Sequence, residues 1–252
     1  MKAILKNRQQ ITTRDTLYEF TCPDISAKAR PGQFVEIRIT SGTDPYLRRP
    51  ISIFDAEGDS FRVLVRNVGR GTNIISTWQT GHEADIIGPI GNGFSFFDQD
   101  QNVLIAAGGI GVAPLYFLAR RLIEAGKNVT LLFSPHRDSK VLECFNIAEQ
   151  LSLVFAENRN VLPVVLNGIL AGDFDRIYAC GPVGFLQTVS ESGRETGVKV
   201  QVSVENRMAC GIGVCLGCVV PIRRGDHELY LRACEDGPIF DGNEVIWDEM
   251  PT

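Results

Sequence analysis

The chain of 252 residues is 44% apolar and 22% charged, and its 25 Lys and Arg against 30 Asp and Glu give a net charge of −5. This length and composition exclude a miniprotein, a disordered chain and a fibre, and they favour two compact units with hydrophobic cores of their own. The negative balance argues against nucleic acid and anionic lipid as partners, because both are bound by basic surfaces.

Residues 1–98 have the pattern of a small antiparallel β-barrel. Residues 35–39 and 61–66 alternate apolar with polar side chains and are bounded by Gly, Pro, Asp and Ser, as half-buried strands are. Several short strands separated by turns predict a barrel. A glycine-rich stretch at residues 88–93 and a polar stretch at residues 98–102 mark the end of this unit.

A candidate phosphate-binding motif lies within the barrel region. Arg49 stands three residues before the hydroxyl of Ser52 in a strand context. The guanidinium group of Arg binds phosphate through two parallel hydrogen bonds, so this pair suits a phosphorylated ligand. An ordinary strand with exposed arginines explains the same residues equally well.

Residues 99–204 change to alternating strands and helices. Residues 103–107 form a continuous apolar run, as a strand buried on both faces does, and a helix with one apolar face begins near Pro114. We expect a helical stretch at residues 139–150 and further strands at residues 129–133, 176–179 and 198–204, the last being the final strand. This alternation predicts a parallel, doubly wound α/β sheet.

Two loops at strand ends of this sheet form a candidate nucleotide site. The first, between a strand and a helix, contains Gly108, Gly109 and Gly111. Unpaired N–H groups and the positive end of the helix dipole there attract an anion such as a dinucleotide pyrophosphate. The second loop, at an edge where open α/β sheets bind ligands, contains Cys180, Gly181 and Pro182. A tight turn without a ligand remains the alternative for the glycine loop.

Four of the seven cysteines cluster in the C-terminal unit, residues 205–252. Cys210, Cys215, Cys218 and Cys234 are separated by four, two and fifteen residues. The first two spacings are those of plant-type [2Fe–2S] ferredoxins, and the intervening glycines permit tight turns around a cluster. A structural zinc site with four cysteine ligands is the alternative, although zinc sites usually contain two pairs of closely spaced cysteines. We therefore predict these four residues as iron ligands.

The motifs together resemble the ferredoxin–NADP reductase superfamily. The segment Arg49, Pro50, Ile51 and Ser52 is similar to its flavin motif, in which the Arg contacts FAD phosphate and the Ser lies near the isoalloxazine ring. A second group of residues resembles the other flavin segment of this superfamily, namely Leu64, Val65, Arg66, Gly71 and Thr72. A third group resembles the pyridine-nucleotide elements of the superfamily, namely Gly108, Gly109, Gly111, Cys180, Gly181 and Pro182. The resemblance implies an antiparallel FAD-binding barrel, an NAD-binding α/β domain and a small C-terminal [2Fe–2S] unit.

Within that superfamily, an iron–sulfur segment preceded by residues 204–208 is similar to one subfamily, the electron-transfer subunits of class 1B, NAD-dependent dihydroorotate dehydrogenases of pyrimidine biosynthesis. The resemblance implies an FMN-containing catalytic partner in a heterotetramer with two copies of each chain, and electron flow through [2Fe–2S] and FAD to NAD+. Related subunits serve sulfide dehydrogenases, sulfhydrogenases and ferredoxin-dependent oxidoreductases, which are the alternative. We assign no catalytic residue.

The division of the chain also indicates what it lacks. No residues remain for the roughly 250-residue (β/α)8 barrel that would oxidise the substrate, so we expect that activity in another chain. Neither an export signal nor an apolar run long enough to span a membrane is evident, and we expect a cytoplasmic protein. The resemblance favours NAD, but the cations His136, Arg137 and Lys140 leave NADP open.

Overall fold

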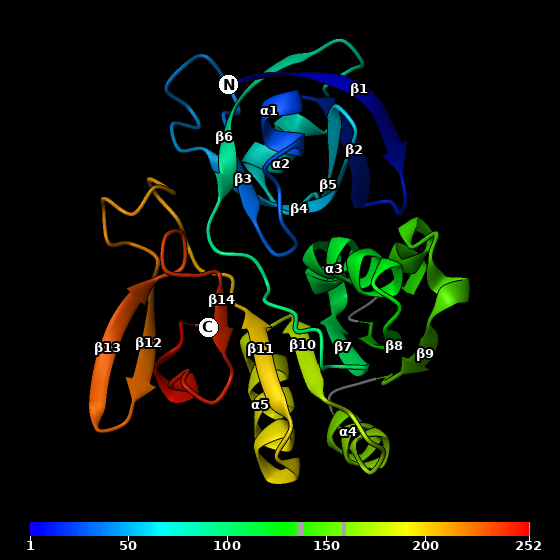
Figure 1. Ribbon diagram of the computed structural model, residues 1–252. Coiled ribbons are helices and arrows are strands. Elements are labelled where there is room, and N and C mark those ends of the chain that lie inside the picture. Colours follow the sequence, from blue (N-terminus) through cyan, green and yellow to red (C-terminus); the bar gives the residue numbers. More distant parts are fainter. Residues whose placement is uncertain (136–138, 158–159, 252) are drawn as a thin grey trace.

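The computed structural model describes residues 1–135, 139–157 and 160–251. A barrel formed by the N-terminal half packs above an α/β sheet, and a β-hairpin from the C-terminal segment projects beside that sheet (Figure 1). Among the described residues, no helix has the length and apolar character needed to cross a membrane.

The predicted antiparallel barrel is confirmed. Six strands close in the order β1-β2-β5-β4-β3-β6, and the short helices α1 (Pro23–Ser26) and α2 (Arg70–Ile75) connect β2 to β3 and β5 to β6. The strands are β1 (Lys2–Gln10), β2 (Asp15–Thr21), β3 (Phe34–Ile37), β4 (Arg49–Glu57), β5 (Ser60–Arg66) and β6 (Glu83–Ile90). The sequence pattern predicts an exposed face on the third strand, but all four residues of β3 are buried. The reason is that the cysteine loop from the C-terminal unit covers that face, with Gly211 against Glu36.

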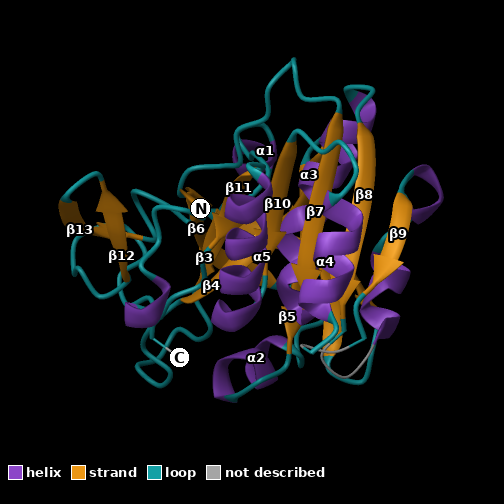
Figure 2. Ribbon diagram, turned by 90° about the horizontal axis from the view of Figure 1, so that it is seen from below, coloured by secondary structure: helices purple, strands orange, loops and turns teal. Residues whose placement is uncertain are grey.

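The second domain is the expected doubly wound sheet. Its parallel strands run in the order β9-β8-β7-β10-β11, with helix α3 on one face and α4 and α5 on the other (Figure 2). The strands are β7 (Asn102–Gly108), β8 (Asn128–Ser134), β9 (Ser152–Phe155), β10 (Arg176–Cys180) and β11 (Lys199–Ser203). The helices are α3 (Ala113–Glu124), α4 (Leu162–Leu170) and α5 (Val183–Thr196).

Two expectations for this domain are wrong. Residues 139–150 form only the 3-10 turns Ser139–Cys144 and Ala148–Gln150, and the stretch between these turns buries Phe145 and Ile147. Strand β11 is not the last strand of the sheet, since β14 (Ile239–Asp241) pairs with it in antiparallel fashion. A strand of three residues carries too short a pattern to be detected in the sequence.

The C-terminal unit contacts the second domain through its hairpin and its last turn as well as through β14. Its hairpin, β12 (Val219–Arg224) and β13 (His227–Arg232), contributes Val220 and Ile222 to the core that lies under α4 and α5. A final 3-10 turn at Trp247–Glu249 packs near α5. The cysteine loop is therefore anchored on a shared core and a shared sheet.

The barrel and the α/β domain are connected through a buried carboxylate. Asp55 on β4 is 1% exposed and pairs with both Arg62 of the barrel and Arg120 of α3, whose Nη2 lies 2.7 Å from Asp55 Oδ1. Phe54 stacks on Tyr116 of the same helix with ring centroids 4.2 Å apart. These contacts fix helix α3 against the barrel, and with it the glycine loop at its start.

Candidate functional site

A cavity of about 330 Å³ lies where the barrel meets the α/β domain. Strands β4 and β5, helix α2, the start of α3 and the segment after β11 all contribute to its walls. The predicted flavin residues that line it are Arg49, Pro50, Ile51, Ser52, Leu64, Arg66 and Thr72. Val65, one position along β5, lies in the barrel core instead, because alternate residues of a strand point to opposite faces.

The cations of this cavity are held in place by their neighbours. Arg66 donates to Asp15 through Nε at 2.7 Å and Nη2 at 2.9 Å, and Asp15 is 1% exposed. Arg49 donates to the carbonyl of Leu47 at 2.6 Å. Gly71 does not line the cavity but makes room for Arg49, because a Cβ at this position would lie 2.6 Å from Arg49 Nε. Two fixed guanidinium groups in an otherwise largely apolar cavity fit a flavin that carries phosphates.

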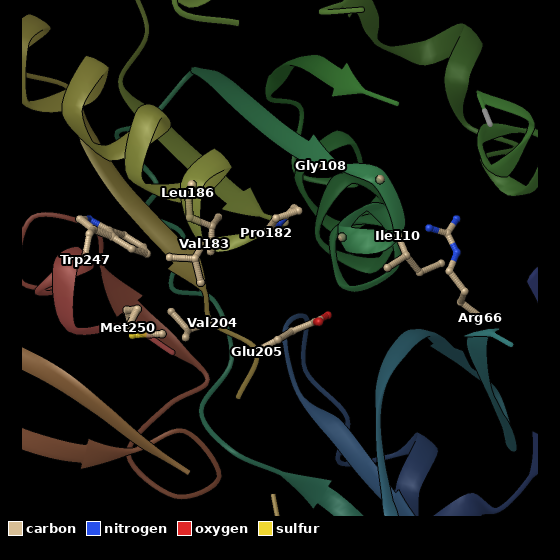
Figure 3. Close-up of a pocket in the computed structure, with 14 residues that line it drawn as sticks. Arg66, Gly108, Ile110, Pro182, Val183, Leu186, Val204, Glu205, Trp247 and Met250 are labelled. Atoms are coloured by element: carbon tan, nitrogen blue, oxygen red, sulfur yellow. The ribbon is translucent and has the colours of Figure 1, made fainter. Parts of the chain in front are cut away.

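A second cavity, of about 560 Å³, opens at the carboxyl ends of β7 and β10 (Figure 3). Five of the predicted nucleotide residues line it, namely Gly108, Gly109, Gly111, Gly181 and Pro182. Gly109 begins a 3-10 turn that continues directly into α3, so the loop presents backbone N–H groups at a helix start. This geometry suits a dinucleotide pyrophosphate.

The two glycine loops approach so closely that no side chain fits between them. A Cβ on Gly111 would lie 2.6 Å from the carbonyl carbon of Cys180 and 2.8 Å from the amide nitrogen of Gly181. The Cys180 side chain itself is fully buried beneath the cavity and does not line it. Burial raises the pKa of its thiol well above the usual value, so it remains protonated.

The two cavities adjoin each other. Arg66, Ile110, Val204 and Glu205 line both, so ligands in the two cavities would meet at this wall. Glu205 extends into the space between the domains in Figure 3. Adjoining cavities of this kind permit hydride transfer between a nicotinamide and a flavin.

The sequence analysis missed several residues of the site, one that holds a lining arginine and two that line the nucleotide cavity. Asp15 carries no local motif, and its role depends on a partner 51 positions along the chain. Trp247 and Met250 close the far end of the nucleotide cavity from the C-terminal segment. His136 and Arg137, two of the residues for which NADP remains an alternative to NAD, lie outside the described residues.

The four predicted metal ligands come together in two pairs. Cys218 and Cys234 are buried, with their sulfur atoms 3.3 Å apart. The Cys215 amide donates to Cys210 Sγ at 3.4 Å, and the Cys215 thiol also donates to it. These bonds and the amide of Ile212 lower the pKa of Cys210 to about 6, which favours the thiolate form that binds metals.

The loop backbone donates to sulfur where a cluster would require it. Gly213 N lies 3.1 Å from Cys234 Sγ, and both Gly211 and Gly213 have positive φ, at 67° and 79°. Hydrogen bonds from backbone amides to thiolates are a means by which proteins stabilise iron–sulfur clusters. The donor set therefore fits the cluster.

The arrangement of the thiols distinguishes the two candidate metals. A structural zinc ion needs four converging ligands, whereas each iron of a [2Fe–2S] cluster takes two cysteines. Two cysteine pairs favour the binuclear cluster.

The cysteine loop exposes apolar side chains around this centre. Ile212, Val214 and Leu216 are 54%, 76% and 62% exposed. Exposed apolar side chains gathered on one loop are typical of a protein interaction site.

Comparisons with known proteins agree with this geometry. Residues 205–246 match the family model described as the iron–sulfur cluster binding domain of dihydroorotate dehydrogenase B. The chain is 35% identical over 227 residues to a dihydroorotate dehydrogenase B (NAD(+)) electron transfer subunit of Shouchella clausii, covering 86% of this chain and 87% of that protein. A subunit of the same name from Caldanaerobacter subterraneus is 33% identical over 250 residues, and the match covers 98% of each chain.

Solved structures show the same fold. An NADH-dependent reduced ferredoxin–NADP oxidoreductase superposes with a TM-score of 0.85 at 30% identity, covering 98% of this chain and 90% of that one. The ferredoxin reductase of carbazole 1,9a-dioxygenase, at 21% identity and a TM-score of 0.64, shares the fold over 79% of this chain.

Proposed function

The chain belongs to the family of electron-transfer subunits of dihydroorotate dehydrogenase B, and we propose that it carries electrons from a separate, FMN-containing dihydroorotate dehydrogenase subunit to NAD+ in pyrimidine biosynthesis. The observation that carries this proposal is the continuity of three sites. The segment after β11 lines the flavin cavity through Asn206 and Met208 and reaches the first cysteine, Cys210, two residues later. The flavin cavity in turn shares a wall with the nucleotide cavity.

The chemistry requires this order of sites. A bound flavin exchanges a pair of electrons with nicotinamide and single electrons with an iron–sulfur cluster. The chain's own residues bind and orient these groups. Arg49 and Arg66 hold the flavin side, and the glycine loops hold the dinucleotide. The two thiol pairs, Cys210 with Cys215 and Cys218 with Cys234, would hold the cluster.

We assign the remaining roles as follows. Residues 1–98 form the FAD unit, residues 99–204 the NAD unit and residues 205–252 the cluster unit. Ser52 and Thr72 contact the flavin, and the exposed apolar side chains of the cysteine loop dock on the catalytic subunit, so that the cluster lies close to the FMN. We place the protein in the cytoplasm, because that compartment keeps cysteines reduced and so available as cluster ligands.

The experiment that tests this function is reconstitution with the catalytic subunit of the same organism. We expect dihydroorotate-dependent reduction of NAD+ only when both chains are present, and a complex that contains two copies of each. A native partner without FMN and without dihydroorotate activity would refute the proposal.

One observation favours a second candidate. The ferredoxin–NADP oxidoreductase matches at 30% identity over 98% of this chain, so a subunit of a ferredoxin-dependent enzyme has the same layout. The same reconstitution with reduced ferredoxin in place of dihydroorotate distinguishes the two, because only one electron donor should support NADH formation.

A further inference from the structure

Glu36 is a buried acid without a partner. It lies in the middle of β3 and is 1% exposed. Among the described residues, its two carboxylate oxygens are the buried side-chain oxygen or nitrogen atoms that have no hydrogen-bond partner. Burying a carboxylate without hydrogen bonds is unfavourable, so such a residue usually reflects a functional requirement.

The position of Glu36 connects the flavin cavity with the cysteine loop. Phe34, two residues earlier and therefore on the same face of β3, lines the flavin cavity. The Glu36 carboxylate itself lies against Gly211, where a Cβ would overlap Oε1 and lie 2.6 Å from Cγ. Gly211 directly follows Cys210. The acid thus lies between the two sites that hold redox groups.

The nearby cations do not neutralise this carboxylate by direct contact. Arg48 pairs with Asp85 at 2.7 Å and, at 3.5 Å, reaches only the backbone carbonyl of Glu36. Arg49 donates to the carbonyl of Leu47. Both arginines attract the Glu36 carboxylate through space, while Cys210 and burial act in the opposite direction and raise the pKa of Glu36 to about 7.

Glu235 provides an internal comparison. Its carboxylate lies against Gly213, the second glycine of the loop with positive φ, where a Cβ would lie 2.7 Å from Cδ. Unlike Glu36, it is 52% exposed and forms an ion pair with Arg232 at 2.7 Å. Two acids therefore touch the same loop, one buried and unpaired, the other solvated and paired.

We propose that the Glu36 carboxylate lowers the reduction potential of the iron–sulfur cluster held by the adjacent cysteine loop. An electron added to the cluster places negative charge near a carboxylate that neither solvent nor an ion pair screens. The repulsion disfavours the reduced cluster and favours onward transfer to the flavin. The inference rests on the proposed function, since it requires that the loop bind the cluster.

The test is the one-electron midpoint potential of the cluster in the purified chain. This potential is followed by electron paramagnetic resonance of the reduced cluster during titration with dithionite at pH 8.5, above the pKa of about 7 to which burial raises Glu36. We expect Glu36→Gln to favour cluster reduction by about tenfold in the equilibrium constant, which corresponds to a rise of 59 mV for a one-electron couple. Glu36→Asp, which retains the charge, should stay near the wild-type potential.

The matched control is Glu235→Gln, which removes an equal charge from beside the same loop, at Gly213. We expect its shift to be less than one third of that of Glu36→Gln, because solvent and Arg232 already screen Glu235. Equal shifts in both variants, or an unchanged potential in Glu36→Gln, would overturn the inference.

Two further outcomes separate this inference from the proposed function. A wild-type chain that holds no cluster after anaerobic reconstitution contradicts the proposed function itself. If Glu36→Gln and Glu36→Met both lose the cluster while Glu36→Asp keeps it, the carboxylate is needed for assembly, and its assignment as a determinant of potential is wrong.

Discussion

Gly111→Ala is expected to block the nucleotide cavity without removing any ligand contact. The added Cβ would lie 2.6 Å from the carbonyl carbon of Cys180, whereas ordinary van der Waals contact begins at 3.4 Å. The carbonyl oxygen of Cys180 lies nearer still, so the glycine loop and the end of β10 would have to separate by about 1 Å. The opposing atoms belong to the backbone, so no side chain can rotate away to relieve the overlap.

The structure gives the size of the effect. Misplacement of a binding element by about 1 Å can cost on the order of 100-fold, so we expect a rise of about 10- to 100-fold in the KM for NADH. Overpacking at a buried contact costs about 1–3 kcal/mol, which lowers the melting temperature by roughly 2–12 °C for a chain of this size. FAD content should not change, because Gly111 does not line the flavin cavity.

The assay is NADH oxidation with an artificial dye as acceptor, which requires neither the cluster nor the partner subunit. Gly168→Ala is the matched control, because it lies in the exposed part of α4 with no atom within 4 Å of the added Cβ. This control should keep its KM and gain about 0.5–1 kcal/mol of helix stability. A Gly111→Ala variant whose KM for NADH stays within about twofold of wild type would show that the close approach of the two loops does not shape the nucleotide site.

Three other substitutions test the remaining sites. Cys218→Ser should lose the [2Fe–2S] absorption and electron transfer from the catalytic subunit, yet keep FAD and NADH–dye activity, because its thiol lies in the cysteine loop and not in either cavity. Arg49→Ala removes a fixed cation from the flavin cavity and should weaken FAD binding by about 10- to 100-fold, measured as FAD retained after gel filtration. Asp55→Asn leaves Arg62 and Arg120 without their buried partner and should cost about 3–5 kcal/mol, visible as a lower melting temperature.

Each of these has a control on the same chain. Cys22→Ala, a buried cysteine outside the loop, should keep its cluster. Arg38→Ala, whose guanidinium bonds the carbonyl of Thr40 at 3.0 Å, should keep its FAD. Asp44→Asn breaks an exposed pair with Arg70 and should cost less than about 1 kcal/mol. A cluster in Cys218→Ser, full FAD in Arg49→Ala, or an unchanged melting temperature in Asp55→Asn would contradict the corresponding assignment.

Local patterns in the sequence were sufficient for the two domains. Strand alternation at residues 61–66 and the apolar run at residues 103–107 depend on the period of side-chain exposure within one element, and both strands form as predicted. The spacing of Cys210, Cys215 and Cys218 is likewise local, since all three lie within nine residues of the chain.

Contacts between segments far apart in the chain could not be predicted from these local patterns. Strand β14 joins the sheet 36 residues after β11 ends, and nothing in its three residues reveals its partner. The alternating pattern around Glu36 predicts a solvated acid, and only the folded chain shows the cysteine loop covering it. Asp15, which fixes Arg66 in the flavin cavity, is equally invisible without the pairing of β2 with β5.

The sequence by itself determined that this protein has a barrel, a nucleotide-binding sheet and a four-cysteine loop, because periodicity and spacing are properties of short stretches of chain. The tertiary structure alone decided that the flavin and nucleotide cavities share a wall, that the thiols form two pairs, and that an unpaired carboxylate touches the loop that holds them. These features depend on the distances between segments far apart in the chain, which packing sets and local pattern does not record.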